Sequence, residues 1–488
     1  MKSIKLLTTG TLAVLLLLFF VSCDDYLDVN VNPNAPADAT ENLMLSGLLG
    51  EFSYRVIGNW PARTPARWTQ QLAWNGVPPS SDNYEYTESD ANAAWLYLYT
   101  HSMKNARELN ERAEARENYR YAGIAKIIHA WALSIATDLY NEIPYSEAFD
   151  PVDTPLPSYD TQEEIYEVIF QYLNAAIDDF DREPGALVPG SDDLLYNGDI
   201  EKWRRMAYTL KARLHMRLSY APGNSAEERA QNALTALANG FQSGDDDADF
   251  AYVNAPGAQN PWWQFTMGVW DDRDQLSHHY IELLTDLNDP RIHVQARPIE
   301  AVYPDSVAYA GNVNGSGGEG VANISRIGEF YNAASADLNW ISYSEAKFIE
   351  AEAVFLTQGA GAADPVYRDA VAASMERLNV DAHTYVEAGE VEDYIDTLPS
   401  LTDVDDPYEA IMVQKYIANF LNHEVYNDWR RTGYPQLELA QDPVIDQIPR
   451  RFPYPLTEWQ NNPTNVEAAG IPFGFASMTH TVWWDTRD

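Results

Sequence analysis

Cysteine is almost absent from the chain, since Cys23 is the single one among 488 residues. One thiol excludes an internal disulfide and any zinc or iron–sulfur centre built from several cysteines. Basic residues are also scarce, with 32 Lys and Arg against 73 Asp and Glu and a formal net charge of −41. Such a surface repels phosphate backbones and anionic lipids. Nucleic-acid binding is therefore excluded, and membrane attachment has to be covalent or made through a partner.

Signatures of common enzymes are missing as well. The chain has no P-loop, H-E-x-x-H or G-x-S-x-G motif, and its nine histidines are scattered. The G-x-G-x-x-G match at residues 315–320 lacks the preceding strand and following helix of a dinucleotide site, so we interpret it as a surface loop. We predict a protein that is not an enzyme and has no cofactor. Among 73 acidic residues, a carboxylate pair at glycosidase spacing must occur by chance, which leaves a surface glycoside hydrolase as an alternative.

Two acidic runs have the composition of calcium loops but not their spacing. They are Asp245, Asp246, Asp247 and Asp249, and Asp403, Asp405 and Asp406. Neither run supplies both the glycine at position six and the glutamate at position twelve of an EF-hand loop. We interpret both as solvated acidic loops and leave opportunistic calcium binding open.

The N-terminus predicts export and a lipid anchor. Two lysines precede an uncharged, leucine-rich run at residues 12–20, a pattern typical of a secretory signal. The apolar stretch at residues 6–21 is shorter than the roughly 20 residues of a membrane-spanning helix. The tetrad Phe-Val-Ser-Cys at residues 20–23 resembles a bacterial lipobox, in which the cysteine is acylated and becomes the first residue of the mature protein.

This segment sets the expected domain boundaries. We predict a lipoprotein signal peptide at residues 1–22, lipidation of Cys23 and a polar, Asn- and Pro-containing tether at residues 23–40. The acidic pair directly after the cysteine is similar to a surface-export signal of some Gram-negative lipoproteins. Several acyl chains anchor a protein stably, where one chain is marginal. Residues 41–488 are expected to form one domain on the exterior of the outer membrane.

Hydrophobic periodicity predicts an all-α scaffold. Apolar residues recur at i, i+3, i+4 and i+7, the stripe that buries one face of a helix, in five segments: 121–140, 162–180, 200–219, 342–356 and 408–421. Thr161 and Glu164 have the spacing of a capping box at the start of the second segment. Strict alternation is scarce, so no large sheet is expected, and no repeat near 34 residues is visible.

The periodicity is lost between residues 241 and 339, in a segment rich in Gly, Asn, Pro and aromatic residues. Long loops in compact domains are usually functional. The chain also contains 14 Trp, 30 Tyr and 16 Phe, and many of them lie outside the helical stripes. A flat aromatic face can stack on the C–H face of a sugar while neighbouring polar groups bind its hydroxyls. The alternative is that these rings hold loops onto the core. The candidate ligand-binding residues are Trp74, Asn75, Tyr84, Tyr86, Trp262, Trp263, Trp270, Asp271 and Arg273.

Several stretches together resemble the SusD/RagB family of nutrient-binding outer-membrane lipoproteins, and more narrowly its SusD-like branch. The run D-L-Y-N-E-I-P-Y-S-E-A at residues 138–148 is similar to the family's helix-to-loop signature. The other stretches that carry the resemblance, in chain order, are residues 23–28, 203–219, 287–291 (with Asp-Pro-Arg), 426–435 (with Trp-Arg-Arg-Thr-Gly-Tyr-Pro) and 448–455, followed by Glu458, Asn461 and Asn465.

The resemblance implies a single α-domain of tetratricopeptide-like helix pairs overlaid by long loops. It also implies a partner, a SusC-like TonB-dependent transporter barrel, over whose extracellular mouth the lipoprotein lies like a lid. The cargo would be an oligosaccharide or, in some members, a peptide. Ligand residues vary within the family, so the resemblance assigns none here.

Four arginines stand out in this acid-rich chain, namely Arg430, Arg431, Arg450 and Arg451. We expect them to form partly buried bidentate pairs with carboxylates, a role for which the planar guanidinium is well suited. Binding of a carboxylate substrate is the alternative.

Overall fold

The helices expected from the periodicity are present, each within three residues of the expected bounds. They are α6 (Tyr119–Tyr140), α7 (Gln162–Asp181), α8 (Ile200–Arg217), α14 (Tyr343–Gln358) and α17 (Pro407–Ala418). The computed structural model describes residues 39–78, 80–150, 152–268, 273–299, 307–318 and 323–487. The expected signal peptide, Cys23 and nearly all of the tether lie outside these ranges.

The remaining α-helices of the described residues are α2 (Glu41–Glu51), α3 (Trp60–Trp68), α4 (Glu88–Leu96), α5 (Asn105–Ala115), α9 (Ala226–Leu237), α10 (Pro261–Trp263), α11 (His278–Asp286), α12 (Ile292–Gln295), α13 (Glu329–Asn332), α15 (Ala360–Arg377), α16 (Glu390–Thr397), α18 (Glu424–Thr432), α19 (Leu456–Asn461) and α20 (Pro463–Ala468). Three π-helical turns are η1 (Phe52–Ile57), η3 (Tyr97–Lys104) and η5 (Gln264–Gly268), and four 3-10 turns are η2 (Ser81–Asn83), η4 (Gly244–Asp246), η7 (Val380–Ala382) and η8 (Phe475–Thr479).

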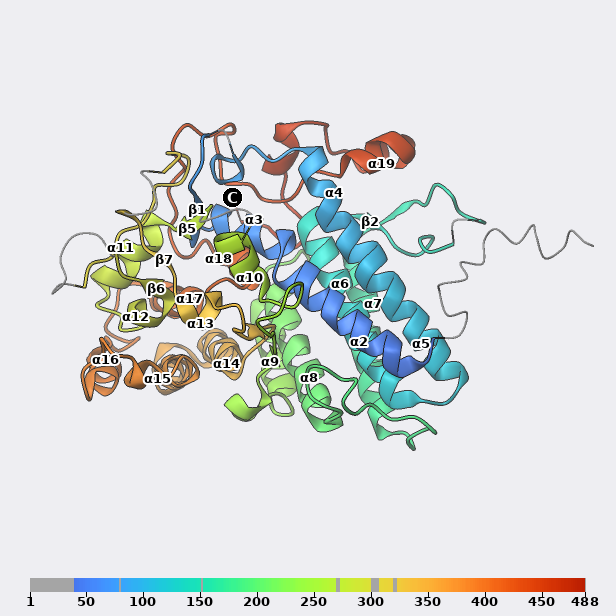
Figure 1. Cartoon of the computed structure of the whole chain (residues 1–488), viewed down its shortest axis with the longest axis horizontal. Helices are drawn as coiled ribbons and strands as arrows, with labels where there is room; N and C mark the ends of the chain where they lie inside the picture. Colours follow the sequence, from blue (N-terminus) through green and yellow to red (C-terminus); the bar gives the residue numbers. More distant parts are fainter. Residues whose placement is uncertain are drawn as a thin grey trace, which may run out of the picture.

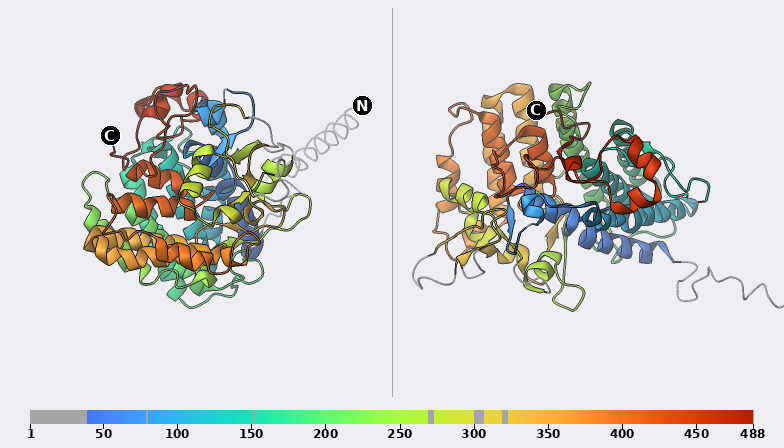
Figure 2. Two further views of the ribbon diagram at one scale, coloured as in Figure 1. Left: turned by 90° about the vertical axis from the view of Figure 1, so that its left-hand side faces the viewer. Right: turned by 90° about the horizontal axis from the view of Figure 1, so that it is seen from above.

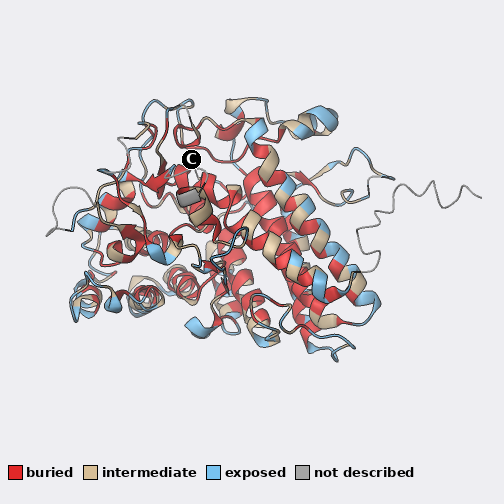
Figure 3. Cartoon of the chain, viewed as in Figure 1, coloured by how far each residue is buried: buried red, intermediate tan, exposed pale blue. Residues whose placement is uncertain are grey.

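Successive long helices pack against one another in the order α5, α6, α7, α8, α9, α14 and α15. In Figure 1 the blue and teal helices lie on one side and the orange helices on the other, with α8 and α9 between them. The view from above in Figure 2 shows the same succession. Buried residues line the inward faces of these helices, as Figure 3 shows. The expected all-α scaffold of paired helices is thus confirmed.

The described strands are two or three residues long and form antiparallel pairs that join distant parts of the chain. β1 (Leu72–Trp74) pairs with β5 (Asp274–Leu276), and β2 (Ile143–Pro144) with β3 (Tyr159–Asp160). β4 (Asp249–Phe250) pairs with β8 (Leu338–Asn339), and β6 (Ala296–Arg297) with β7 (Arg326–Ile327). The segment at residues 241–339 is therefore not one long loop, as its lost periodicity suggested. Its short elements bury their side chains against the rest of the protein, and their length is too small for a period to show.

Two other features of the described residues bear on the sequence analysis. Where the structure describes the chain, no helix has the length and apolarity that crossing a membrane requires. Around the G-x-G-x-x-G match, the described residues form no strand-turn-helix unit, and Gly315 donates its backbone N–H to Asp82 Oδ2 at 3.0 Å. The described part of the motif is thus tied to the loop that follows β1.

Candidate ligand-binding site

A cleft of about 470 Å³ opens between α3, β1, η2 and α4. This volume lies within the range of small-molecule sites. We call it the Trp74 cleft and define it by its lining residues: Trp60, Arg67, Trp74, Ser80, Ser81, Glu85, Tyr86, Ser89, Asp90 and Ala93.

Backbone hydrogen bonds fix Trp74 at the edge of this cleft. It is the last residue of β1 and lies opposite Asp274 in the β1–β5 ladder. Its N–H donates to Asp82 Oδ2 at 2.9 Å, and its carbonyl accepts from Asn312 Nδ2 at 3.2 Å. Three separate segments therefore hold the residue while its ring stays half-buried.

A buried charge cluster supports the two tryptophans of the cleft. Arg63 and Arg67, one turn apart on α3, both pair with Asp274, and Arg67 Nε lies 2.6 Å from Oδ1. Burial alone would raise the pKa of the Asp274 carboxyl, but the two guanidinium groups hold it below its ordinary value. The Arg63 guanidinium lies 5.0 Å from the ring centre of Trp60, and that of Arg67 lies 4.6 Å from Trp74. Both rings are therefore held by cation–π contacts in an orientation fixed before any ligand arrives.

Polar side chains complete the lining between the rings. Ser80, Ser89, Glu85 and Asp90 bring hydroxyl and carboxylate oxygens to the cleft. One Asp90 oxygen, Oδ2, accepts the Thr87 N–H at 2.8 Å in the capping box of α4. Aromatic faces beside hydroxyls and carboxylates match the two faces of a sugar, since its C–H bonds stack and its hydroxyls hydrogen-bond.

The structure brings four of the expected site residues together. Trp74 and Tyr86 line the cleft. Asn75 and Arg273 lie beside them, because the Asn75 N–H donates to the Arg273 carbonyl at 2.8 Å. The exposed Arg273 guanidinium lies 5.7 Å from the ring centre of Trp74. Tyr86 is 2% exposed and packs edge-on against Trp68, so it offers a ligand little surface.

Other expected residues lie elsewhere. Tyr84 is a core residue at 1% exposure, its hydroxyl accepts the Ala440 N–H at 2.9 Å, and burial raises its pKa to about 12. Its role is packing, the alternative weighed for these rings. Trp262 is also 1% exposed, and Trp263 beside it is half-buried. Trp270 and Asp271 lie outside the described residues.

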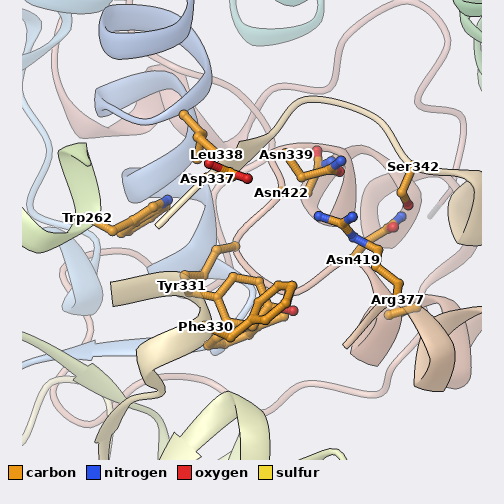
Figure 4. Close-up of a pocket in the computed structure, with 13 residues that line it drawn as sticks. Trp262, Phe330, Tyr331, Asp337, Leu338, Asn339, Ser342, Arg377, Asn419 and Asn422 are labelled. Carbon is orange, nitrogen blue, oxygen red and sulfur yellow. The ribbon is translucent and has the colours of Figure 1, made fainter. Parts of the chain in front are cut away.

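Trp262 faces a separate, narrow pocket of about 30 Å³, shown in Figure 4. Phe330, Tyr331 and Arg377 also line it. A space of this size suits one or two water molecules rather than a sugar. The buried Trp262 indole N–H has no hydrogen-bond partner among the described residues, as expected of a group that binds such a water.

Several residues of the cleft were not predicted from the sequence, notably Arg67, Glu85, Ser89 and Asp90. Trp60 is an aromatic residue of the same N-terminal region, but it was not among the candidate residues. The signal that could have found Arg67 is the spacing of Arg63 and Arg67 in an acidic chain, which places two guanidiniums on one helix face. The serines and carboxylates of α4 carry no comparable signal.

The acidic runs are only partly the solvated loops that we expected: Asp245, Asp403 and Asp405 are exposed, but the other carboxylates have partners within the protein. Asp247 and Asp249 pair with Arg377 at 2.6 and 2.9 Å, and Asp246 pairs with Arg205 at 3.0 Å. In the second run, Asp406 caps α17. Asp246 is buried and Asp247, Asp249 and Asp406 are half-buried, so guanidinium and backbone N–H partners replace part of their water. Within the described ranges, no three His, Cys, Asp or Glu side chains are grouped so that they could hold a metal ion.

Comparison with known families identifies the class of protein. The chain belongs to the SusD-like family described as starch-binding and associating with the outer membrane, whose sequence profile matches residues 33–455. The resemblance noted in the sequence is thereby confirmed. No curated protein matches the chain in sequence.

Solved structures share this fold over almost the whole chain. A chitin-binding protein is 26% identical with a TM-score of 0.76, covering 92% of this chain and 100% of its own. A SusD/RagB family protein from Bacteroides thetaiotaomicron is 23% identical, with the same TM-score and coverage. A chitin-binding SusD homologue from Flavobacterium johnsoniae is 22% identical with a TM-score of 0.74, covering 91% of this chain and 99% of its own.

Proposed function

We propose that this protein is a non-enzymatic cell-surface lipoprotein that captures an oligosaccharide in the Trp74 cleft. The observation that carries the proposal is the cleft itself, in which two partly exposed tryptophans lie beside serines and carboxylates. The family description as starch-binding and the chitin-binding structural relatives support a glycan as the ligand class.

The captured glycan would pass to a SusC-like TonB-dependent transporter. The expected lipid on Cys23 would keep the protein at the exterior of the outer membrane, over the mouth of that barrel. This role needs a binding site and no catalyst, which agrees with the missing enzyme motifs. Family membership supports association with the outer membrane.

Binding is tested by calorimetry of the mature protein with maltoheptaose and chitohexaose. We expect Trp74→Ala to weaken the binding of whichever sugar binds by about tenfold or more, equivalent to about 1.4 kcal/mol. Trp483→Ala, which removes a half-buried tryptophan outside the cleft, is the matched control and should bind as the wild type does. Equal sugar affinity of the wild type and both variants would mean that the ligand binds somewhere other than at Trp74.

Two further outcomes separate the alternatives. Binding of peptides from a casein digest, with no binding of either sugar, would indicate the peptide-carrying role. Shortening of the sugar by pure protein, abolished by one Asp or Glu substitution, would indicate a glycoside hydrolase.

The transporter is tested by purifying a C-terminally tagged protein from detergent-solubilised outer membrane. A large β-barrel should co-purify with it, and a clean lipidated monomer would contradict the lid role. Cys23→Ser should release the protein from the membrane fraction, because the acyl chains have no other attachment site.

A further inference from the structure

A second groove, of about 590 Å³, lies on another side of α4. Figure 1 shows α4 standing between β1 and α3 on one side and β2 and α19 on the other. Asn92, Trp95 and Leu96 of α4 line this groove, whereas Ser89, Asp90 and Ala93 line the Trp74 cleft. We call it the Phe149 groove. The rest of its lining is Tyr99, Thr100, Lys104, Pro144, Ala148, Phe149, Thr154, Pro155, Pro157, Thr457 and Glu458.

Three aromatic rings form one wall of the Phe149 groove. Trp95 stacks on Tyr99 with 4.6 Å between ring centres and 28° between planes. Tyr99 stacks in turn on Phe149 at 6.0 Å and 29°. The Tyr99 hydroxyl donates to the Pro144 carbonyl at 2.6 Å, which fixes the middle ring. The wall is thus rigid and continuous across two segments of the chain.

Phe149 reaches this wall through a costly backbone conformation. Its φ is +71°, in the left-handed region that a bulky residue adopts rarely and at a cost of roughly 1–2 kcal/mol. Its ring also contacts His129 and Tyr145, at 6.3 Å between ring centres in both cases, and remains half-buried. Such an outlier persists where the surroundings fix it, and it is a reason to look for a function.

Apolar surface remains exposed around the groove. Leu96 is 48% exposed, and Leu156, on the loop that supplies Pro155 and Pro157, is 59% exposed. Asn92, Thr100 and Thr457 bring hydrogen-bonding groups to the groove, and Lys104 and Glu458 bring one charge of each sign. The groove therefore offers apolar faces, hydrogen bonds and no net charge, the combination that suits a neutral sugar.

We propose that the Phe149 groove is a second carbohydrate subsite, which binds a further part of the same glycan chain that occupies the Trp74 cleft. This inference rests on the proposed function. α4 connects the two sites, and a helix with its side chains is about 10–12 Å across. A chain of several sugar units is therefore needed to reach both. Occupation of both sites by one chain raises affinity without new contacts at either, because the second binding step becomes intramolecular.

The test compares short and long sugars, chitobiose with chitohexaose and maltose with maltoheptaose. We expect the wild type to bind the longer member of one series at least about tenfold more tightly than the shorter. Phe149→Ala should remove most of this difference while leaving the affinity for the disaccharide unchanged. Trp74→Ala should weaken both members.

A second variant distinguishes loss of the subsite from a local change of fold caused by replacing Phe149, whose backbone conformation is strained. Leu96→Asp alters only an exposed position and should have the same effect as Phe149→Ala. Leu43→Asp, at a 63% exposed leucine of α2, is the matched control and should bind as the wild type does. Wild-type length dependence in both groove variants would overturn the second subsite while leaving the Trp74 cleft in place. Absence of sugar binding by the wild type would overturn the proposed function and the subsite together.

Discussion

At the scale of single residues, the four prominent arginines divide into two kinds. Arg450 makes the expected bidentate pair with Asp485, and Arg431 makes one with Glu352. Arg430 instead donates to two backbone carbonyls, at 2.7 and 2.8 Å, and Arg451 also bonds to carbonyls. The expectation was wrong for this second pair because the last turn of α6 and the loop at residues 450–452 present carbonyls, which accept from a guanidinium as a carboxylate does.

The Arg431 pair yields a stability prediction. Arg431 is fully buried with Glu352, and it also donates to Asp428 at 2.8 Å. Arg431→Ala leaves these buried carboxylates short of a partner, so we expect it to lower the free energy of unfolding by about 3–5 kcal/mol. Arg107→Ala breaks the exposed pair with Glu111 and should cost less than about 1 kcal/mol. Urea denaturation measures the free energy of unfolding of both variants. Equal losses would contradict the expectation that the buried pair matters more than the exposed one.

At the scale of elements, the N-terminus of α7 shows how a local sequence pattern becomes structure. Thr161 Oγ1 accepts the Glu164 N–H, and the Glu164 carboxylate accepts the Thr161 N–H at 3.1 Å, as the expected capping box requires. Thr161→Ala should cost about 1 kcal/mol in urea denaturation. Thr235→Ala, at an exposed position inside α9, should be neutral or slightly stabilising because Ala favours the helix interior. If Thr161→Ala lost no more stability than Thr235→Ala, the capping box would not stabilise α7 as expected.

Comparing the elements also shows which parts of the structure could be predicted from the sequence and which could not. The long helices were predictable because their apolar stripe recurs within one segment. The ladder that positions Trp74 was not, because it pairs three residues of β1 with three of β5, about 200 residues later. Trp74 and Trp262 look alike in sequence, both beside polar loop residues. One lines a wide cleft and the other a narrow pocket, a difference set by packing partners from distant segments.

At the scale of the whole molecule, histidines buried as neutral groups tie stability to pH. Burial lowers the pKa of His129 to about 4 and that of His423 to about 3, against about 6.5 in an unfolded chain. A lowered histidine pKa means that the unfolded chain binds the proton first. The stability gained by keeping each histidine neutral is therefore fully present above pH 6.5 and is lost as the pH falls towards 4. At pH 5 each histidine accounts for about 2 kcal/mol of lost stability.

The proton uptake of one histidine can be isolated by comparing the wild type with a variant that lacks it. All other titrating groups are present in both proteins, so their effects on stability cancel. Asp247 opposes the histidines, since burial raises its pKa to about 6 and its contribution to stability grows as the pH falls from 6 to 4.

His129→Asn loses the Nδ1 contact to the Met103 carbonyl and should be less stable than the wild type at pH 7.5. Between pH 6.5 and 5, however, its unfolding free energy should fall less steeply than that of the wild type, by up to about 1.4 kcal/mol per pH unit. His480→Asn, at an exposed histidine, should keep the wild-type slope. Parallel curves for the wild type and His129→Asn would mean that His129 takes up its proton as readily in the folded protein as in the unfolded chain, so that its pKa is not lowered. The contacts to Met103 and Tyr145 would then have to hold an imidazolium.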